Sequence, residues 1–183
     1  MINRVFGILL LLFLTPVFII VAFFILIEDG YPIFFKQKRI GLNSEIFNIY
    51  KFRSMKKDTP NVATHLLVNS EQYLLKFGGL IRKLSIDELP NIINIIKGEM
   101  VFVGPRPALY NQTDLIRFRR ETGIDKLIPG ITGWAQINGR DDISIEQKVN
   151  YDIEYMIKKS LFFDILILYK TIFKVLNSQN VKH

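Results

Sequence analysis

The longest apolar stretch of the chain is an uncharged run from Val5 to Ile27, VFGILLLLFLTPVFIIVAFFILI. At about 1.5 Å per residue, a helix of this length reaches roughly 35 Å and can cross a hydrocarbon core of about 30 Å. Pro16, in the middle, removes the hydrogen bond to the carbonyl of Leu12 and bends the helix, and the Thr15 hydroxyl offers a partner for freed backbone groups. Each half reaches only about halfway across a bilayer. The pattern predicts a membrane helix and favours a kinked span over a helix that dips in and returns.

Beyond Gly30 the pattern changes to that of a mixed α and β domain. Polar and apolar residues alternate in EIFNIYKFRSM, residues 45–55, which predicts a strand with Lys51 and Arg53 on one face. MVFVG, residues 100–104, is typical of a short buried strand. Three glycines and a proline predict a loop over 128–142. Apolar spacing and capping residues predict helices over 69–83, with a break at Gly78-Gly79, and over 87–97, 111–121, 144–158 and about 160–177.

The last predicted helix, about 160–177, is apolar over most of its surface. Its polar residues form one stripe: Ser160, Asp164, Thr171, Lys174 and Ser178. A wide apolar face bordered by lysines is typical of a helix in the membrane interface, and burial against the domain core fits the pattern about as well. We therefore predict an α+β, membrane-associated fold with a membrane part over 1–29 and a compact cytosolic domain over 30–183. The domain carries a short strand or hairpin element and amphipathic helices.

The composition shows that the chain is basic. The net charge is +7, and nearly all of it lies after residue 35, which points to anionic partners such as phospholipid, nucleotide or nucleic acid. The absence of cysteine excludes disulfides and thiolate metal sites and fits a reducing compartment. The two histidines, His65 and His183, are isolated in polar or terminal sequence, so neither a zinc site nor a histidine-based triad is expected.

An acid pair, Asp87 and Glu88, stands out in this basic chain. Ser85 and Glu88 have the spacing of a capping box. However, a helix that starts at Ser85 would place Pro90 where its missing N–H leaves the carbonyl of Ile86 unpaired, whereas a helix that starts at Asp87 avoids this loss. Asp87 would then lie at the positive end of a helix, which suits a cap, an ionised nucleophile and a metal ligand alike. The local sequence leaves these alternatives open.

Candidate phosphate-binding cations accompany the acid pair. They are Lys51, Arg53, Arg82, Arg106 and Arg140. Arg106 lies between two prolines, so its backbone is fixed and its guanidinium can be aimed at a phosphate. Any one of these cations alone could be a solvated surface charge. An aspartate can attack phosphorus to give an acyl phosphate, and magnesium is the natural cation to let carboxylate and phosphate approach each other.

Several motifs together resemble a known family: KFRSM, RKLSIDELPNIINIIKGEM, VGPRP and PGITGWAQINGR, with the apolar run that contains Thr-Pro. They resemble the small monotopic phosphoglycosyl transferases, the bacterial sugar transferases that begin glycan assembly on polyprenol phosphate. The resemblance covers nearly the whole chain. GEM, GPRPALYNQ and GRDD are most similar to members that begin capsular polysaccharide.

The resemblance implies a reaction in which a UDP-sugar gives its sugar 1-phosphate to undecaprenyl phosphate, with UMP released. It implies that Asp87 is the nucleophile and a magnesium ligand and that Glu88 helps to deprotonate or position the acceptor. Arg82, Arg106 and Arg140, with Lys51 or Arg53, match the family's phosphate-contacting positions.

For the membrane part, the resemblance implies that the Thr15-Pro16 break makes the first helix re-enter, against the preference for a span, so that both its ends lie on the cytoplasmic side of the cell membrane. Asn91 departs from the family, in which glutamine often follows DELP. The donor sugar is expected to be an N-acetylated amino sugar. The oligomeric state, monomer or homodimer, stays open.

Two alternatives belong to other classes of protein. A membrane-tethered nucleic-acid binder is compatible with the basic charge, but the basic residues are spread over turns and no recognition helix is indicated, so no nucleic-acid partner is expected. A membrane-surface scaffold in which Asp87 is only a helix cap would tolerate asparagine at position 87, because asparagine caps helices equally well.

Overall fold

The computed structural model describes residues 1–59, 70–139 and 143–176. The helices are α1 (Ile2–Asp29), α2 (Gly78–Lys83), α3 (Asn91–Lys97), α4 (Thr113–Glu121), α5 (Trp134–Asn138), α6 (Ile145–Lys158) and α7 (Leu161–Leu176). The strands are β1 (Phe34–Ile40), β2 (Ile46–Phe52), β3 (Val101–Val103), β4 (Ala108–Leu109) and β5 (Gly130–Thr132). Short 3₁₀ turns are η1 (Leu42–Ser44), η3 (Ser70–Tyr73), η4 (Ile86–Glu88) and η5 (Ile124–Lys126). The predicted mixture of helix and strand is confirmed.

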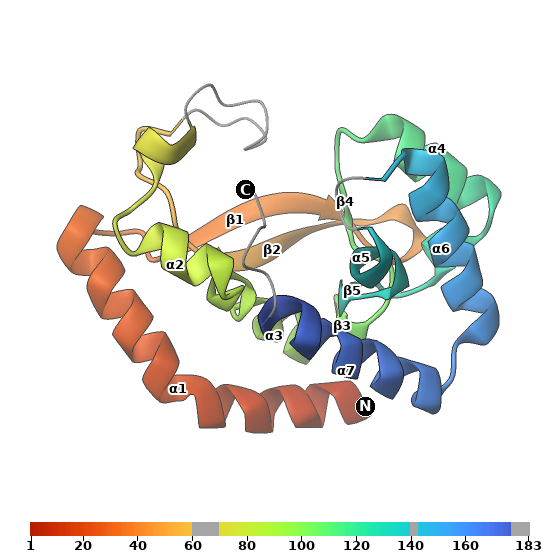
Figure 1. The fold of residues 1–183 in the computed structure, drawn as a ribbon, viewed down its shortest axis with the longest axis horizontal. Coiled ribbons are helices and arrows are strands. Elements are labelled where there is room, and N and C mark those ends of the chain that lie inside the picture. Colours follow the sequence, from red (N-terminus) through yellow and green to blue (C-terminus); the bar gives the residue numbers. More distant parts are fainter. Residues whose placement is uncertain (60–69, 140–142, 177–183) are drawn as a thin grey trace.

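The β1–β2 hairpin is the framework on which the other elements are arranged. It lies across the upper part of Figure 1, with α2 and α3 beneath it and with α1 and α7 along the lower edge. The strands are antiparallel, β4 adds to the free side of β1, and Phe35 lies opposite Lys51 in the register. The strand predicted within 45–55 is confirmed, but it ends at Phe52, so Arg53 lies just beyond it.

The prediction of a loop over 128–142 is wrong for the described part of that segment. It contains β5, which pairs in parallel with β3, and the short helix α5. The glycines are there because two backbones meet: a Cβ on Gly130 would lie 2.1 Å from the amide nitrogen of Gly104. A glycine demanded by close packing looks the same in a sequence as a glycine demanded by a turn.

The predicted helices are confirmed in most places. Ser144 and Gln147 form both bonds of the capping box that opens α6. The helix predicted over 69–83 is shorter, because α2 begins only at Gly78, where a Cβ would lie 2.0 Å from the carbonyl oxygen of Ser54. Gly98 ends α3 in a left-handed conformation with φ of 86°.

Helix α1 is a single helix that is bent, and Figure 1 shows it as two arms that meet near its middle. Pro16 lies inside it, and the Thr15 hydroxyl donates to the carbonyl of Leu11 at 2.9 Å. In the second arm, Val21 and Ile25 are buried in a cluster with residues of the body. The outer face of α1 exposes a series of large apolar side chains: Leu9, Leu12, Phe13, Ile19, Phe23 and Ile27. Within the described residues, α1 alone is long and apolar enough to cross a membrane.

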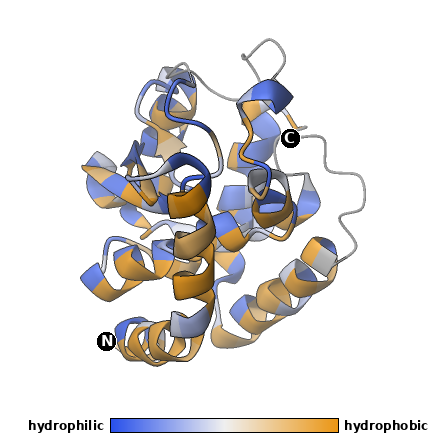
Figure 2. Cartoon of the chain, turned by 90° about the vertical axis from the view of Figure 1, so that its left-hand side faces the viewer, coloured by the Kyte–Doolittle hydropathy of each residue, from blue (hydrophilic) through white to orange (hydrophobic). Residues whose placement is uncertain are grey.

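Helix α7 is amphipathic with its polar side turned inward. Asp164 pairs with the Tyr155 hydroxyl at 2.9 Å, Thr171 with Thr132 at 2.8 Å, and the Lys174 ammonium donates to the carbonyl of Gln136 at 3.0 Å. The opposite face exposes Leu161, Phe162, Ile165, Leu168, Tyr169, Ile172 and Phe173. Helices α1 and α7 both lie along the lower edge in Figures 1 and 2, and the hydropathy colouring of Figure 2 shows them as largely hydrophobic. Together they give one side of the molecule an extended exposed apolar surface, which is typical of a membrane or protein interaction site.

Candidate active site

The acid pair lies on the 3₁₀ turn η4, between α2 and α3. The chain reaches this turn through Ser85, which has a left-handed conformation with φ of 55° and makes no side-chain cap bond. Helix α3 begins only at Asn91, and Pro90, which occupies its N-cap position, makes no side-chain cap bond either. The prediction that a helix starts at Asp87 is therefore wrong, and Asp87 does not act as the cap of α3.

The 3₁₀ geometry also resolves the difficulty that Pro90 presents. Because hydrogen bonds in such a turn span three residues, the amide of Leu89 donates to the carbonyl of Ile86 at 3.1 Å. The missing N–H of Pro90 thus leaves this carbonyl paired. The turn needs no carboxylate to satisfy its backbone, so both acidic side chains are available for other contacts.

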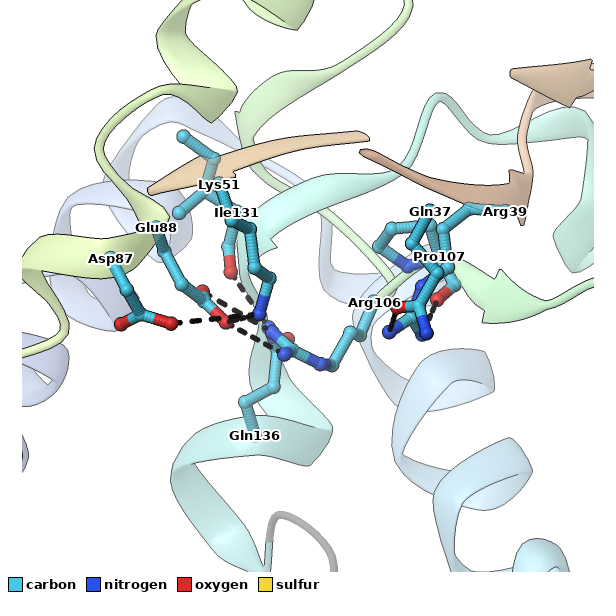
Figure 3. A network of polar contacts seen from close by, with 9 residues as sticks. All are labelled: Gln37, Arg39, Lys51, Asp87, Glu88, Arg106, Pro107, Ile131 and Gln136. Atoms are coloured by element: carbon cyan, nitrogen blue, oxygen red, sulfur yellow. Dashed lines mark hydrogen bonds and ion pairs between the residues drawn. The ribbon is translucent and has the colours of Figure 1, made fainter. Parts of the chain in front are cut away.

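Glu88 is held by two cations from distant parts of the chain. Its Oε1 lies 2.7 Å from the ammonium of Lys51 on β2 and 2.8 Å from the guanidinium of Arg106 in the turn after β3 (Figure 3). Burial alone would raise the pKa of Glu88, but Arg106 and Lys51 together outweigh it and hold the pKa well below its usual range. Glu88 is therefore ionised at neutral pH and fixed in place.

Asp87 points toward the same cations but makes no close ion pair. Its Oδ2 lies 4.0 Å from the Lys51 ammonium, and its side chain is 13% exposed. Burial, the largest effect, and the charge of Glu88 raise its pKa to about 6, against the opposing effects of Lys51, Arg82 and Arg106. Above that pH, Asp87 is an ionised carboxylate whose oxygens are not engaged by a short ion pair, which is the condition of a nucleophile or metal ligand.

A cleft opens beside the acid pair. Its walls come from both sheets and from α3, and it is lined by Arg39, Ile49, Lys51, Glu88, Asn91, Met100, Arg106, Pro107, Gly130 and Ile131. Arg39 was missed in the sequence, and Asn91 was noted there only as a departure from the family motif. Arg39 could have been found from the hairpin register, which puts it opposite Phe47 and on the face that carries Lys51. Asn91 is buried, and its Oδ1 has no hydrogen-bond partner within the described residues.

The predicted cations have different positions in the structure. Lys51 and Arg106 meet at Glu88, and Arg82 is near enough to lower the pKa of Asp87. The structure does not bring Arg53 to the acid pair, because its guanidinium is bonded to the carboxylate of Asp29 and donates to the carbonyl of Pro32 at 2.7 Å. Arg140 lies outside the described residues.

A divalent cation fits the donor set at Asp87 better than at Glu88. Both cationic partners of Glu88 occupy its oxygens, whereas the nearest cation to Asp87 is 4.0 Å away. In the described part of the chain, no cluster of three or more histidine, cysteine or acidic side chains could enclose a metal. One available carboxylate suits magnesium, which binds through one or two carboxylates together with substrate phosphates.

The turn carries two carboxylates beside a cleft. Cations neutralise one of them, and the other has a raised pKa. Such an arrangement is typical of an enzyme active site. Comparison with known proteins agrees. The sequence profile of the family described as bacterial sugar transferase matches residues 1–178. This chain belongs to that family and is a transferase, which confirms the resemblance found in the motifs.

Individual relatives are similar over most of this chain. It is 44% identical over 156 residues to a protein of Bacillus subtilis called an uncharacterized sugar transferase, which covers 85% of this chain and 76% of the relative. It is 37% identical over 180 residues, 94% of the chain, to the UDP-glucose:undecaprenyl-phosphate glucose-1-phosphate transferase of Escherichia coli. It is 36% identical over 171 residues, 88% of the chain, to the UDP-N-acetylgalactosamine-undecaprenyl-phosphate N-acetylgalactosaminephosphotransferase of Aeromonas hydrophila. The matched region is only 39% and 40% of the last two proteins.

The raised pKa of Asp87 predicts how its replacement changes stability. A carboxyl group whose folded pKa of about 6 exceeds the ordinary 3.8 opposes folding once it is ionised, so stability is lost as the pH rises between these values. We expect Asp87→Asn to stabilise the protein at pH 7.5 by about 1–3 kcal/mol and to have little effect below pH 4. Thermal unfolding in detergent at both pH values measures this difference.

Asp114→Asn is the matched control, because the Asp114 side chain is 64% exposed. It should change the unfolding temperature little at either pH. A lower unfolding temperature for Asp87→Asn at pH 7.5 would mean that the charge of Asp87 stabilises the fold, as the charge of a structural carboxylate does. That result would contradict the assignment of Asp87 as a reactive carboxylate whose ionisation opposes folding.

Proposed function

We propose that this transferase moves a sugar 1-phosphate from a UDP-sugar to undecaprenyl phosphate and so forms a polyprenyl diphosphosugar and UMP. The main observation behind the proposal is the difference between the two acids. Glu88 holds two cations in place, and Asp87 lies beside them without a short ion pair, so its carboxylate can react with a substrate. The names of the Escherichia coli and Aeromonas hydrophila relatives support the same type of reaction.

The proposed chemistry has two steps. An oxygen of Asp87 attacks the phosphorus that carries the sugar, the bond to UMP breaks, and an acyl phosphate forms. A phosphate oxygen of undecaprenyl phosphate then attacks the same phosphorus, and the bond to Asp87 breaks, which restores the carboxylate. Lys51 and Arg106 lie where they can offset the negative charge of the diphosphate in both steps.

The low pKa of Glu88 helps to assign its part. A carboxylate that is stabilised in its ionised form by two cations is a weak base, so we assign Glu88 to positioning Lys51 and Arg106 rather than to deprotonating the acceptor. Asp87 and the substrate phosphates would hold magnesium, which would reduce the repulsion between carboxylate and diphosphate.

The donor sugar is proposed to be an N-acetylated amino sugar. The name of the Aeromonas hydrophila relative specifies N-acetylgalactosamine, whereas that of the Escherichia coli relative specifies glucose. A panel of UDP-sugars is therefore part of the test. The pathway we propose is the first membrane step of capsule or exopolysaccharide synthesis.

We further propose that α1 is re-entrant and that the protein is monotopic, on the cytoplasmic face of the cell membrane. Both arms of α1 contact the body: a Cβ on Gly7 would lie 3.3 Å from the side chain of Ile96, Phe6 packs edge-on against Phe102 with ring centroids 5.3 Å apart, and Val21 is buried in the core. A spanning helix would carry one arm away from a body that lies on one side of the membrane. The apolar outer faces of α1 and α7 would then both enter the lipid, with α7 in the interface.

Turnover tests the proposed reaction. Purified protein in detergent, with undecaprenyl phosphate, magnesium and one UDP-sugar at a time, is expected to release UMP, fastest with an N-acetylated amino sugar. Lys51→Met should lower kcat/KM about 100-fold or more, because it removes a cation that faces both carboxylates. Lys38→Met is the control: Lys38 is exposed on the other face of the hairpin and should leave kcat/KM within about twofold. No UMP release with any UDP-sugar of a broad panel would reject the reaction.

The absence of cysteine makes the topology directly measurable. Single cysteines replace Ile2 and Tyr31, which are 84% and 78% exposed at the two ends of α1. A re-entrant helix places both on the cytoplasmic side, so a membrane-impermeant maleimide should label both in inverted membrane vesicles and neither in intact cells. Labelling of the two positions from opposite sides would establish a span.

A further inference from the structure

The turn that carries Arg106 is held at its start by the amide of Gly104, which donates to the carbonyl of Thr132 at 2.9 Å, and beyond that by its carbonyl groups. Its sequence is Gly104-Pro105-Arg106-Pro107, and the two prolines have no N–H to donate. The carbonyl of Pro105 accepts from the amide of Gly130 at 3.0 Å. The carbonyls of Arg106 and Pro107 accept instead from side chains, and these two bonds help to fix the direction in which the Arg106 side chain leaves the turn.

Both donors are arginines from distant elements. The NH1 group of Arg119, on α4, donates to the carbonyl of Arg106 at 2.7 Å. The NH1 group of Arg39, on β1, donates to the carbonyl of Pro107 at 3.1 Å, a contact visible in Figure 3. Two consecutive carbonyls thus accept hydrogen bonds from different elements, one from α4 and one from β1.

Each arginine is itself fixed by a further partner. The Nε and NH2 groups of Arg119 donate to the same carboxylate oxygen of Asp152, on α6, at 3.0 and 2.6 Å. Asp152 is only 1% exposed. The NH2 group of Arg39 donates to the side-chain oxygen of Gln37 at 2.7 Å (Figure 3). The guanidinium groups therefore have little freedom to release the turn.

Stability alone does not explain the buried pair of Arg119 and Asp152. Removing both charges from water costs about as much as their attraction returns, and apolar residues of similar size often stabilise such a position as well or better. What an apolar pair cannot do is donate to the carbonyl of Arg106. The bond from Arg119 to the carbonyl of Arg106 is thus what this ion pair supplies and an apolar pair would not.

We propose that Arg119, fixed by Asp152, is a positioning residue that, together with Arg39, holds the 104–107 turn so that Arg106 points at Glu88 and at the substrate phosphates. This role rests on the proposed function for its effect on catalysis. Neither Arg119 nor Asp152 needs to touch substrate. The contact at stake is the ion pair of Arg106 with Glu88, at 2.8 Å.

Loosening the turn has a measurable consequence. If Arg119 acts through the turn, its replacement loosens the guanidinium of Arg106 relative to Glu88 and lowers turnover only while Arg106 is present. A residue that supports the fold in general would lower turnover to the same extent with and without Arg106.

The test variant is Arg119→Lys. Lysine can keep an ion pair with Asp152, but its single ammonium cannot reproduce the fork that reaches the carboxylate and the carbonyl of Arg106 together. Arg117→Lys is the matched control on the same helix, because the Arg117 side chain is 60% exposed and pairs with Asp114 at 3.5 Å. Arg39→Lys is a second test variant, for use if Arg119→Lys does not fold.

Two measurements are made on each variant. The first is the order of the Arg106 guanidinium without substrate, read from the NMR signal of its Nε–H group, which Arg106→Lys identifies. The second is kcat/KM for UMP release, measured for the variant alone and in combination with Arg106→Met. We expect either test variant to loosen the Arg106 guanidinium and to lower kcat/KM about 10- to 100-fold, but to lower it less than about threefold when Arg106 is already methionine, while Arg117→Lys matches the wild type.

The outcomes separate the two proposals. A wild type that releases no UMP rejects the proposed function, and the NMR signal still decides whether Arg119 positions Arg106. A wild type that turns over, with folded test variants whose Arg106 signal and kcat/KM equal those of the wild type, overturns the positioning role and leaves the reaction standing. A similar change in Arg117→Lys, or an undiminished loss of kcat/KM in the Arg106→Met background, would also overturn it, because the effect would then not pass through Arg106.

Discussion

The whole site depends on one electrostatic arrangement, the contact of Glu88 with Lys51 and Arg106. Two adjacent carboxyl groups on one turn repel each other, and burial makes both ionised forms costly. The cations remove this cost for Glu88, whose pKa stays low, but they leave part of it on Asp87, whose pKa rises to about 6. The same pair of cations therefore makes the two neighbouring acids different in character.

The fold can be understood as the means of bringing these charges together. Lys51 comes from the hairpin, the acid pair from the turn before α3, and Arg106 from the proline-rich turn between β3 and β4. The small parallel pair β3–β5 and the arginines of β1 and α4 fix that last turn. Helices α1 and α7 expose apolar faces on one side of the molecule. The protein that carries the charged cleft is therefore suited to a lipid boundary.

The sequence predicted those features that depend on local signals. The long apolar run of α1, the capping box of α6 and the alternation of β2 all lie within one segment, and the structure contains each of them. The family motifs located the acid pair in the same way. Lys51 and Arg53 show the limit of such patterns: period two placed them on one face, but the strand ends between them, and Arg53 pairs with Asp29 instead.

Features that depend on long-range contacts could not be predicted. Gly130 in β5 is required by the close approach of Gly104, which follows the parallel strand β3 more than 20 residues away in the chain, so in the sequence it resembled a loop glycine. The bond between Arg119 and Asp152 joins two helices and has no periodic signal. The 3₁₀ turn that frees Asp87 from capping follows from the left-handed Ser85, which neither propensity nor spacing indicates.

We propose that Asp87, and not Glu88, is the reactive carboxylate. The most direct measurement incubates the protein with a UDP-sugar and magnesium in the absence of undecaprenyl phosphate, quenches and digests it in acid, and locates any added mass by peptide mass spectrometry. We expect a sugar phosphate on Asp87 that disappears when undecaprenyl phosphate is added. An adduct on Glu88, or turnover by the full reaction mixture with no adduct at any time, would contradict it.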